Sequence, residues 1–137
     1  MRFHDSEEES QGKTAAWRLP GTHRVVGYAR SLTRDTLTKW GLAGAIEDTQ
    51  LLVSELVTNA VTHSSGPIEL RLHFDKALRC EVTDTTPGEP EARSATEDDE
   101  SGRGLHLIEA LADQWGTIPT ATGKTVWFEK QLVTSSR

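Results

Sequence analysis

The sequence has few of the features that mark secreted or membrane proteins. It contains one cysteine, Cys80, among 137 residues, which excludes an internal disulfide framework and fits a reducing cytoplasm. No apolar run approaches the length needed to cross a bilayer. The polar, acidic start of the chain lacks the apolar stretch of a secretory signal. We therefore expect a cytoplasmic protein that makes no membrane contact.

Positive charge is also scarce. The formal net charge of −6 argues against non-specific binding to nucleic acid, so no direct nucleic-acid partner is expected. Hydrophobic residues make up 35% of the chain and charged residues 26%, proportions typical of a soluble globular protein. The length favours one domain. We expect a frayed acidic tail at residues 1–13, a folded domain at 14–131 and a second tail at 132–137.

Hydrophobic periodicity predicts two helices in the first half of the chain. A short strand at 14–19 precedes a helix at 22–39, with Thr22 as its N-cap and Gly41 as its stop. A second helix is expected at 45–64, where apolar residues recur at helical spacing. Consecutive helices of this length indicate one helical layer.

The period then changes from about 3.6 to about 2. Alternating apolar residues predict a β-hairpin over 68–82, with a tight turn at 75–77 and one buried face. Counting on by two from Val82 reaches Asp84, so its carboxylate should point to the core side at the end of the strand. Residues 85–101 show no period and are acidic, which predicts a lid or a disordered loop.

The last part of the domain repeats both kinds of element. A helix is expected at 105–114, followed by strands at 115–119 and 124–131. The resulting order β-α-α-β-β-loop-α-β-β, with hairpin-linked strands and grouped helices, predicts an α+β two-layer sandwich.

Glu55 and Asn59 are the first candidate site residues. They stand four positions apart on the second predicted helix and so share one face. One interpretation places both on the solvent face of an amphipathic helix. The other makes them a pair of oxygen ligands, or a base beside a ligand, in a polar pocket. The position of Glu55 between Leu52 and Leu56 favours the second.

Two further positions have an ordinary and a functional interpretation. Asp84 either opens an Asx turn or accepts a hydrogen bond from the amino group of a flat ligand. Gly102-Arg103-Gly104 is either a plain loop or, at the start of a helix, an anion site with free backbone N–H groups. Arg103 either adds a cation for phosphate or offsets the acidic run before it.

Some familiar sites are excluded. Gly123-Lys124-Thr125 is not a P-loop, because Ile118 replaces the glycine five positions earlier and a strand follows where a helix is required. The five histidines show no metal-binding spacing. No nucleophile–base arrangement stands out.

Taken in order, these segments resemble the ATP-binding domain shared by gyrase and the histidine kinases, the Bergerat fold. The resemblance is greatest to the single-domain anti-sigma-factor serine/threonine kinases and covers about Trp17 to Lys130. It rests on four segments, Glu55 to Ala60, Val82 to Asp84, Gly102 to Leu105 and Gly123 to Glu129, which follow one another in this order along the chain. It implies a mixed, mostly antiparallel sheet with helices on one face.

The resemblance also implies roles for the candidate residues. Asn59 would hold Mg²⁺ against the phosphates of ATP, Glu55 would be the general base, and Asp84 would accept from the adenine amino group. One glycine, Gly88, is kept where the family often has Gly-x-Gly, and Lys124 stands where many relatives have threonine. The full set implied to bind nucleotide is Asn59, Asp84, Gly88, Gly102, Arg103, Gly104, Leu105, Lys124 and Thr125.

The activity implied by the resemblance is transfer of the γ-phosphoryl group of Mg·ATP to a serine or threonine of an antagonist protein. The same protein would sequester a sigma factor or similar client, and the family allows a homodimer. The alternative is a non-catalytic ATP-binding module that works by sequestration alone. A histidine kinase fragment is disfavoured because no phosphoacceptor helix is apparent, and the acidic charge disfavours a DNA-associated ATPase.

Overall fold

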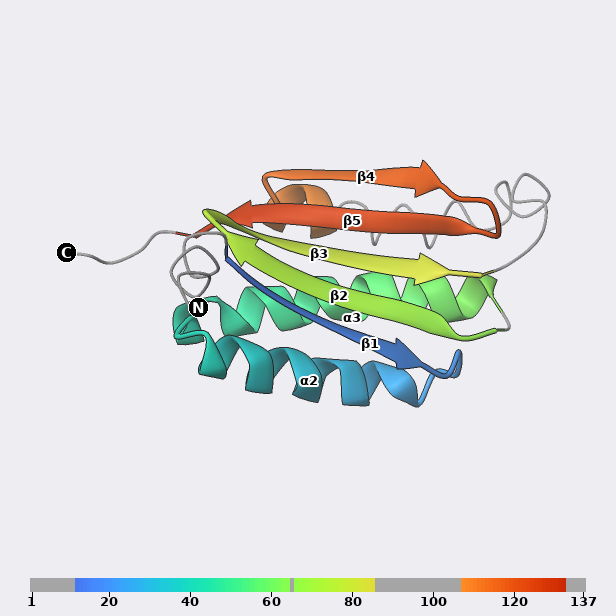
Figure 1. Cartoon of the computed structure of the whole chain (residues 1–137), viewed down its shortest axis with the longest axis horizontal. Coiled ribbons are helices and arrows are strands. Elements are labelled where there is room, and N and C mark those ends of the chain that lie inside the picture. Colours follow the sequence, from blue (N-terminus) through green and yellow to red (C-terminus); the bar gives the residue numbers. More distant parts are fainter. Residues whose placement is uncertain (1–11, 65, 86–106, 133–137) are drawn as a thin grey trace, which may run out of the picture.

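The computed structural model describes residues 12–64, 66–85 and 107–132 (Figure 1). Residues 107–111 are helical. The other elements, in chain order, are β1 (Lys13–Leu19), α2 (Val25–Lys39), the short 3-10 helix η1 (Ala43–Ala45), α3 (Ile46–His63), β2 (Ile68–Asp75), β3 (Ala77–Asp84), β4 (Gln114–Pro119) and β5 (Lys124–Gln131). Most of the predicted N-terminal tail and 85–101 loop, and all but residue 132 of the C-terminal tail, lie outside the described residues.

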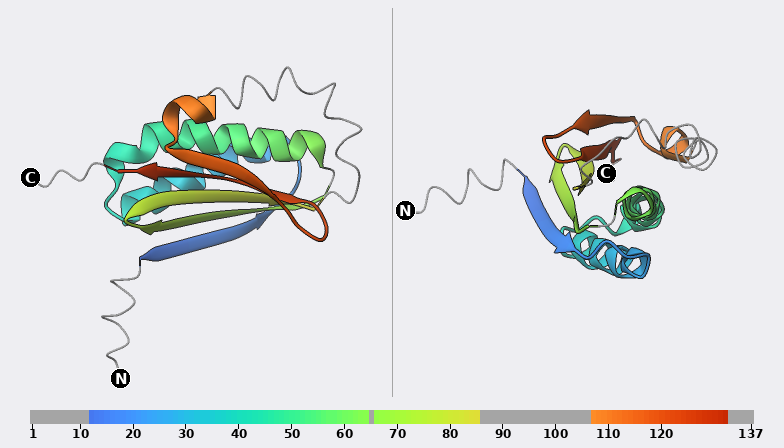
Figure 2. Two further views of the ribbon diagram at one scale, coloured as in Figure 1. Left: turned by 90° about the horizontal axis from the view of Figure 1, so that it is seen from above. Right: turned by 90° about the vertical axis from the view of Figure 1, so that its right-hand side faces the viewer.

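The strands form a single five-stranded sheet in the order β1-β2-β3-β5-β4. All four pairings among these strands are antiparallel. Helices α2 and α3 cover one face of the sheet, and the opposite face carries no helix among the described residues (Figure 2). The predicted α+β two-layer sandwich is therefore confirmed, with an entirely antiparallel sheet in place of the mixed one that the resemblance implies.

The core lies between the helices and the sheet. In β2 and β3, residues alternate between buried and more exposed positions over most of each strand, as a sheet with one covered face requires. In α3, the buried side chains recur every three or four residues and face the sheet. The most completely buried apolar residues are Ala29, Leu37, Leu52, Val53, Leu56, Val57, Ile68, Leu70, Leu72, Leu78, Cys80 and Phe128.

The start of the first helix differs from the prediction. Helix α2 begins at Val25, and Arg24 occupies the N-cap without a side-chain hydrogen bond. The carbonyl of Thr22 accepts a hydrogen bond from the Val25 N–H at 3.0 Å. Thr22 therefore belongs to a tight turn that precedes the helix, and the prediction that it is the N-cap was wrong.

The end of the same helix is as predicted. Gly41 has a φ of 77°, which is in the left-handed region that favours glycine. The Leu42 N–H donates to the Leu37 carbonyl at 2.8 Å, and the Gly41 N–H donates to the Thr38 carbonyl at 3.1 Å. These two bonds are the Schellman pattern, which satisfies carbonyls that the helix end leaves free.

Replacing Gly41 with alanine should lower the free energy of unfolding by about 1 kcal/mol, because only glycine adopts this φ without strain. No heavy atom lies within 4 Å of a Cβ built on Gly41, so the effect is one of backbone conformation alone. Gly44→Ala is the matched control, since its Cβ is equally free and its φ is ordinary. Urea denaturation of both variants measures the difference, and equal stabilities would contradict the backbone argument.

The third helix ends earlier than predicted. The Ala112 N–H donates to the Ile108 carbonyl and closes the last turn, and Gln114 already belongs to β4. The Asp113 N–H donates to the Glu129 carbonyl at 2.8 Å, so pairing with β5 replaces the helix. The prediction that the helix reaches residue 114 was wrong, and its start at Leu105 lies outside the described residues.

Cys80 is fully buried in β3. Burial raises the pKa of its thiol well above the ordinary value, and the charge of Glu81 adds to this while Arg79 opposes it. Since the thiolate is the reactive form, we expect Cys80 to react with a thiol reagent at neutral pH at least about a thousandfold more slowly in the folded protein than in urea. Rapid labelling of the folded protein would show that β3 opens readily.

Candidate functional site

Three element ends meet at one end of the sandwich. The C-terminal ends of α3 and β3 and the start of β5 lie at the same end of the molecule (Figure 1). Helix α3 also packs against β3. The C-terminal half of α3, which carries Glu55 and Asn59, therefore runs toward the end of the sheet that carries Asp84 and Lys124.

On α3, the two predicted residues are half-buried. They flank the stripe of Leu52, Leu56 and Ala60 that packs into the core. The exposed residues of this part of the helix are Leu51, Thr58 and Thr62. Glu55 lies four positions after Leu51 and three before Thr58, so it borders this exposed face, and Asn59 lies between Glu55 and the buried stripe. Both side chains therefore stand at the border between the core stripe and solvent.

Asp84 points into the core side of the sheet, as its position in the strand predicts. It is only 2% exposed and is the last residue of β3. Its direct partner across the β3–β5 pairing is Lys124. The Lys124 ammonium donates a hydrogen bond to Asp84 Oδ2 at 2.8 Å.

This ion pair accounts for the burial of a carboxylate at the end of a strand. A buried charge is costly unless a partner compensates for it. Lys124 supplies that compensation while its own side chain stays 24% exposed, since the long alkyl chain lets the ammonium stay near water. The result is a fixed acceptor group at the edge of the core.

Gly123 presses against the same carboxylate. A Cβ built on Gly123 would lie 2.2 Å from the Asp84 backbone oxygen and 2.6 Å from Asp84 Oδ1. The absence of a side chain at this position is therefore what allows Asp84 to approach so closely. Sequence reasoning does not single out this contact, although a glycine immediately before a paired strand is a known sign of close backbone approach.

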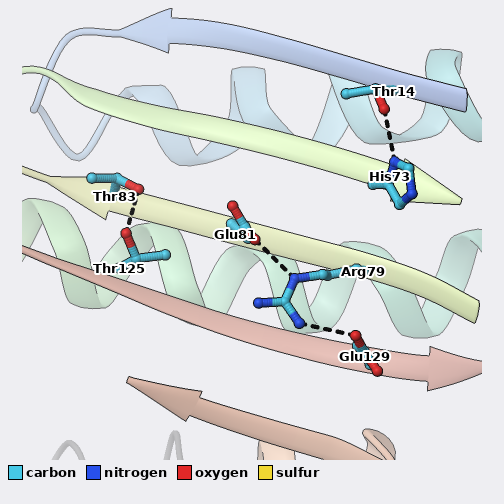
Figure 3. Close-up of polar contacts among 7 residues, drawn as sticks. All are labelled: Thr14, His73, Arg79, Glu81, Thr83, Thr125 and Glu129. Atoms are coloured by element: carbon cyan, nitrogen blue, oxygen red, sulfur yellow. Dashed lines mark hydrogen bonds and ion pairs between the residues drawn. The ribbon is translucent and has the colours of Figure 1, made fainter. Parts of the chain in front are cut away.

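Thr125 lies on the other face of the sheet. Its hydroxyl is 2.7 Å from that of Thr83, its direct partner on β3 (Figure 3). Adjacent residues of a strand point to opposite faces, so Lys124 and Thr125 cannot both stand beside Asp84. Both Lys124 and Thr125 are among the residues that the resemblance assigns to the nucleotide. Of these two, Lys124 is the one that lies next to the Asp84 carboxylate.

A second charged group joins β3 and β5 on that outer face. Arg79 donates to Glu81 at 2.8 Å and to Glu129 at 2.9 Å (Figure 3), and its guanidinium stacks 4.2 Å from the ring centre of Trp127. Burial alone would lower the pKa of Arg79, but the hydrogen bonds and charges of the two glutamates outweigh it and raise that pKa. The cluster stabilises the outer face and lies away from the candidate site.

The remaining predicted residues fall in the predicted loop and at the predicted start of the third helix. All of them lie outside the described residues: Gly88, Gly102, Arg103, Gly104 and Leu105. Their nucleotide contacts stay predictions.

The described residues contain no group of three or more His, Cys, Asp or Glu side chains that could hold a metal ion. Mg²⁺ commonly takes only one or two protein ligands and completes its shell with water and substrate phosphates. The amide oxygen of Asn59 on a half-buried helix face, with the Glu55 carboxylate one turn away, fits that limited role.

No described helix is both long and apolar enough to span a membrane.

Comparison with known proteins agrees with this geometry. The family model of the histidine kinase-like ATPase domain matches residues 19–130. The crystal structure of the RsbU and RsbW domains of Rv1364c from Mycobacterium tuberculosis is similar, with a TM-score of 0.70 and 23% identity. The match covers 91% of this chain but 34% of that one, so the likeness concerns the fold of one part of a longer chain. No curated protein matches the sequence.

Proposed function

Because this chain belongs to the histidine kinase-like ATPase family, we propose that it binds Mg·ATP and phosphorylates a serine or threonine of an antagonist protein. The observation that carries the proposal is the buried Asp84 carboxylate at the end of β3, a strand that α3 packs against and that ends at the same end of the molecule as α3. Glu55 and Asn59 are half-buried in the C-terminal half of that helix. The first can recognise a base, and the other two can serve the phosphates.

At the base end, Asp84 would accept a hydrogen bond from the exocyclic amino group of adenine. A charged acceptor makes this bond stronger than one between neutral groups. Guanine has a carbonyl oxygen at the corresponding position, and that oxygen would face the carboxylate with no proton to donate. Such a mismatch is rejected strongly in a buried site because the polar groups are left unpaired. The site is therefore suited to adenine.

At the phosphate end, the amide oxygen of Asn59 would hold Mg²⁺, which offsets the negative charge of the phosphates when it is bound. Glu55 would accept the proton of the attacking serine or threonine hydroxyl. The hydroxyl oxygen forms a bond to the γ-phosphorus while the bond to the β–γ bridging oxygen breaks, and ADP leaves. Catalysis of this kind depends mainly on positioning and charge.

A regulatory role for this protein is supported by its resemblance to the anti-sigma-factor kinases. The fold that it shares with a structure containing an RsbW domain is consistent with that role. We propose that the protein sequesters a sigma factor or a similar client until the antagonist engages it. Phosphorylation of the antagonist would then favour the return to the client.

The experiment is a pull-down from native extract with and without Mg·ATP, followed by a phosphosite search on the retained proteins. Retention of a partner that gains a phosphoserine or phosphothreonine in the presence of labelled ATP is the expected result. Tight ATP binding without transfer to any retained protein would instead select the non-catalytic sequestration module. Absence of ATP binding would contradict both.

A further inference from the structure

Helix α2 carries a surplus of positive charge on an acidic protein. The helix and its N-cap hold one exposed carboxylate, Asp35, and four exposed cations, Arg24, Arg30, Arg34 and Lys39. The chain as a whole has a formal net charge of −6. None of the four cations takes part in an ion pair within the described residues. We call these four side chains the basic face of α2.

Two of these cations repel each other. Arg30 and Arg34 are four positions apart, so their guanidinium groups lie on the same side of the helix. Like charges at this spacing destabilise a helix. Tyr28 lies on the same outward half of α2 and is 56% exposed, so this helix surface is open to a partner. An anion over the two arginines would remove their repulsion, and the surface therefore favours an acidic occupant.

Strand β1 begins beside the C-terminal end of α2. Lys13, the first residue of β1, is the direct partner of Phe74 on β2. Phe74 packs in the cluster that contains Leu37, which belongs to the last turn of α2. Figure 1 shows the same arrangement, since β1 starts at the end of the sandwich where α2 finishes. The residues that precede Lys13 therefore join the fold close to the basic face.

Those residues are strongly acidic. Residues 5–9 contain four carboxylates, namely Asp5, Glu7, Glu8 and Glu9. Glu9 is four positions and Asp5 eight positions from Lys13, separations that extended chain spans over roughly 13 Å and 26 Å. A helix with the 15 residues of α2 is about 22 Å long. The acidic segment of residues 5–9 can therefore reach most of the basic face.

We propose that this acidic segment docks on the basic face of α2 within the same molecule. The inference goes beyond the proposed function and does not depend on it. Each exposed ion pair contributes little by itself, but a short tether holds the two partners at an effective concentration on the order of millimolar. The contact is therefore a weak, salt-sensitive cover over α2, which an anionic partner of this helix must displace.

Charge balance favours α2 over the other described surfaces. The first turn of α3 carries Glu47 and Asp48. On the outer face of the sheet, arginines are offset by as many glutamates, namely Arg18, Arg71 and Arg79 against Glu69, Glu81 and Glu129. The other acidic run of the chain, 97–100, is seven positions from the nearest described residue, against four positions for the segment 5–9. A longer tether lowers the effective concentration.

The test places a nitroxide spin label on Ser6→Cys in the full chain and records the broadening of backbone amide NMR signals. Burial of Cys80 leaves position 6 as the reactive thiol. At low ionic strength, signals of α2 between Arg30 and Lys39 should broaden. At 1 M salt, where the Debye length is about 3 Å, the broadening should be lost. Arg30→Glu combined with Arg34→Glu should reduce it about tenfold, because two attractions become repulsions.

Two further variants separate specific pairing from net charge. Arg18→Glu combined with Arg71→Glu reverses as many charges on the outer face of the sheet, where both arginines are exposed, and should leave the broadening on α2 unchanged. Adding Glu7→Lys and Glu8→Lys to the α2 double variant should restore the broadening, because the opposite charges have then been exchanged. Thermal unfolding, recorded for each variant, should show that these exposed substitutions keep the fold.

Several results would overturn the proposal. Absence of broadening on α2 at low salt would mean that the run 97–100 or a separate partner is the occupant. Equal broadening in a mixture of spin-labelled protein and unlabelled nitrogen-15 protein would make a second copy the occupant. An equal loss in the sheet variant, or no restoration by the charge exchange, would show that only net charge matters. None of these results concerns ATP binding, so the proposed function is tested separately.

Discussion

Asn59→Ala is expected to abolish Mg·ATP binding, whereas Glu55→Ala is expected to keep binding and lose phosphoryl transfer. The two side chains stand one helical turn apart and are both half-buried beside the same core stripe, so truncation of either removes similar bulk from a similar environment. Any difference between the variants must therefore come from the chemistry of the removed group.

The expected sizes follow from that chemistry. Loss of the metal-holding amide should weaken Mg·ATP binding by more than about 100-fold, which exceeds the loss typical for groups that only orient a metal ligand. Loss of a general base should reduce the transfer rate by about 10²- to 10⁴-fold with little change in affinity. Calorimetry with Mg·ATP measures the first effect, and transfer of labelled phosphate to the antagonist measures the second.

Thr58→Ala is the control for both variants, because Thr58 lies between them in sequence but is exposed on the solvent face of α3. It should behave like the unmodified chain in binding and transfer. If Asn59→Ala and Glu55→Ala both transfer phosphate at near-normal rates, the assignment of this helix face to the phosphate end is wrong.

Local pattern is enough to predict the orientation of Asp84 but not its partner. The alternation that continues from Val82 carries the carboxylate to the core side, and the structure confirms this with an exposure of 2%. Lys124 is forty positions away. Which residue of β5 stands opposite Asp84 depends on the register between two strands that are distant in the chain, and that register is set by the packing of the whole sheet.

The errors at helix ends have a related cause. Thr22 has the chemistry of an N-cap, but the chain makes one more turn before α2 begins at Val25. Gln114 continues a plausible helix, yet the pairing of Asp113 and Gln114 with β5 takes their backbone into the sheet. At residues 113 and 114 a tertiary contact decides between two locally acceptable conformations, whereas at Thr22 a local turn hydrogen bond decides. Gly41 is predicted well because its φ of 77° is a local requirement.

The exposure of Glu55 and Asn59 could be predicted only in part from the sequence. Helical spacing shows that they share a face, but not whether that face meets water or the rest of the protein. The structure makes both residues half-buried, beside the exposed face that Leu51, Thr58 and Thr62 form. Their chemical roles still rest on the resemblance and await the substitutions described above.

Gly123→Ala is expected to be the most damaging small substitution near the base end of the site. The added Cβ would lie 2.2 Å from the backbone oxygen of Asp84 and 2.6 Å from its carboxylate. Both distances are too short for non-bonded atoms, so something must move. Because the first of these atoms belongs to the main chain of β3, relief requires a shift of backbone rather than a rotation of a side chain. Overpacking of this kind typically costs about 1–3 kcal/mol, and we expect the upper part of that range.

Two consequences can be measured. The melting temperature should fall by roughly 6–12 °C, as about 2–3 kcal/mol implies for a domain of this size. ATP binding should weaken as well, because the shift moves the carboxylate that the adenine amino group would meet.

Gly116→Ala is the matched control, since its Cβ would meet only side-chain atoms of Trp127, at 3.0 Å, on the outer face. That ring can move slightly, so a small loss of stability and unchanged ATP binding are expected there. If Gly123→Ala is as stable as Gly116→Ala and binds ATP normally, then Gly123 does not constrain Asp84, and the close approach described for the site is not what orients the carboxylate.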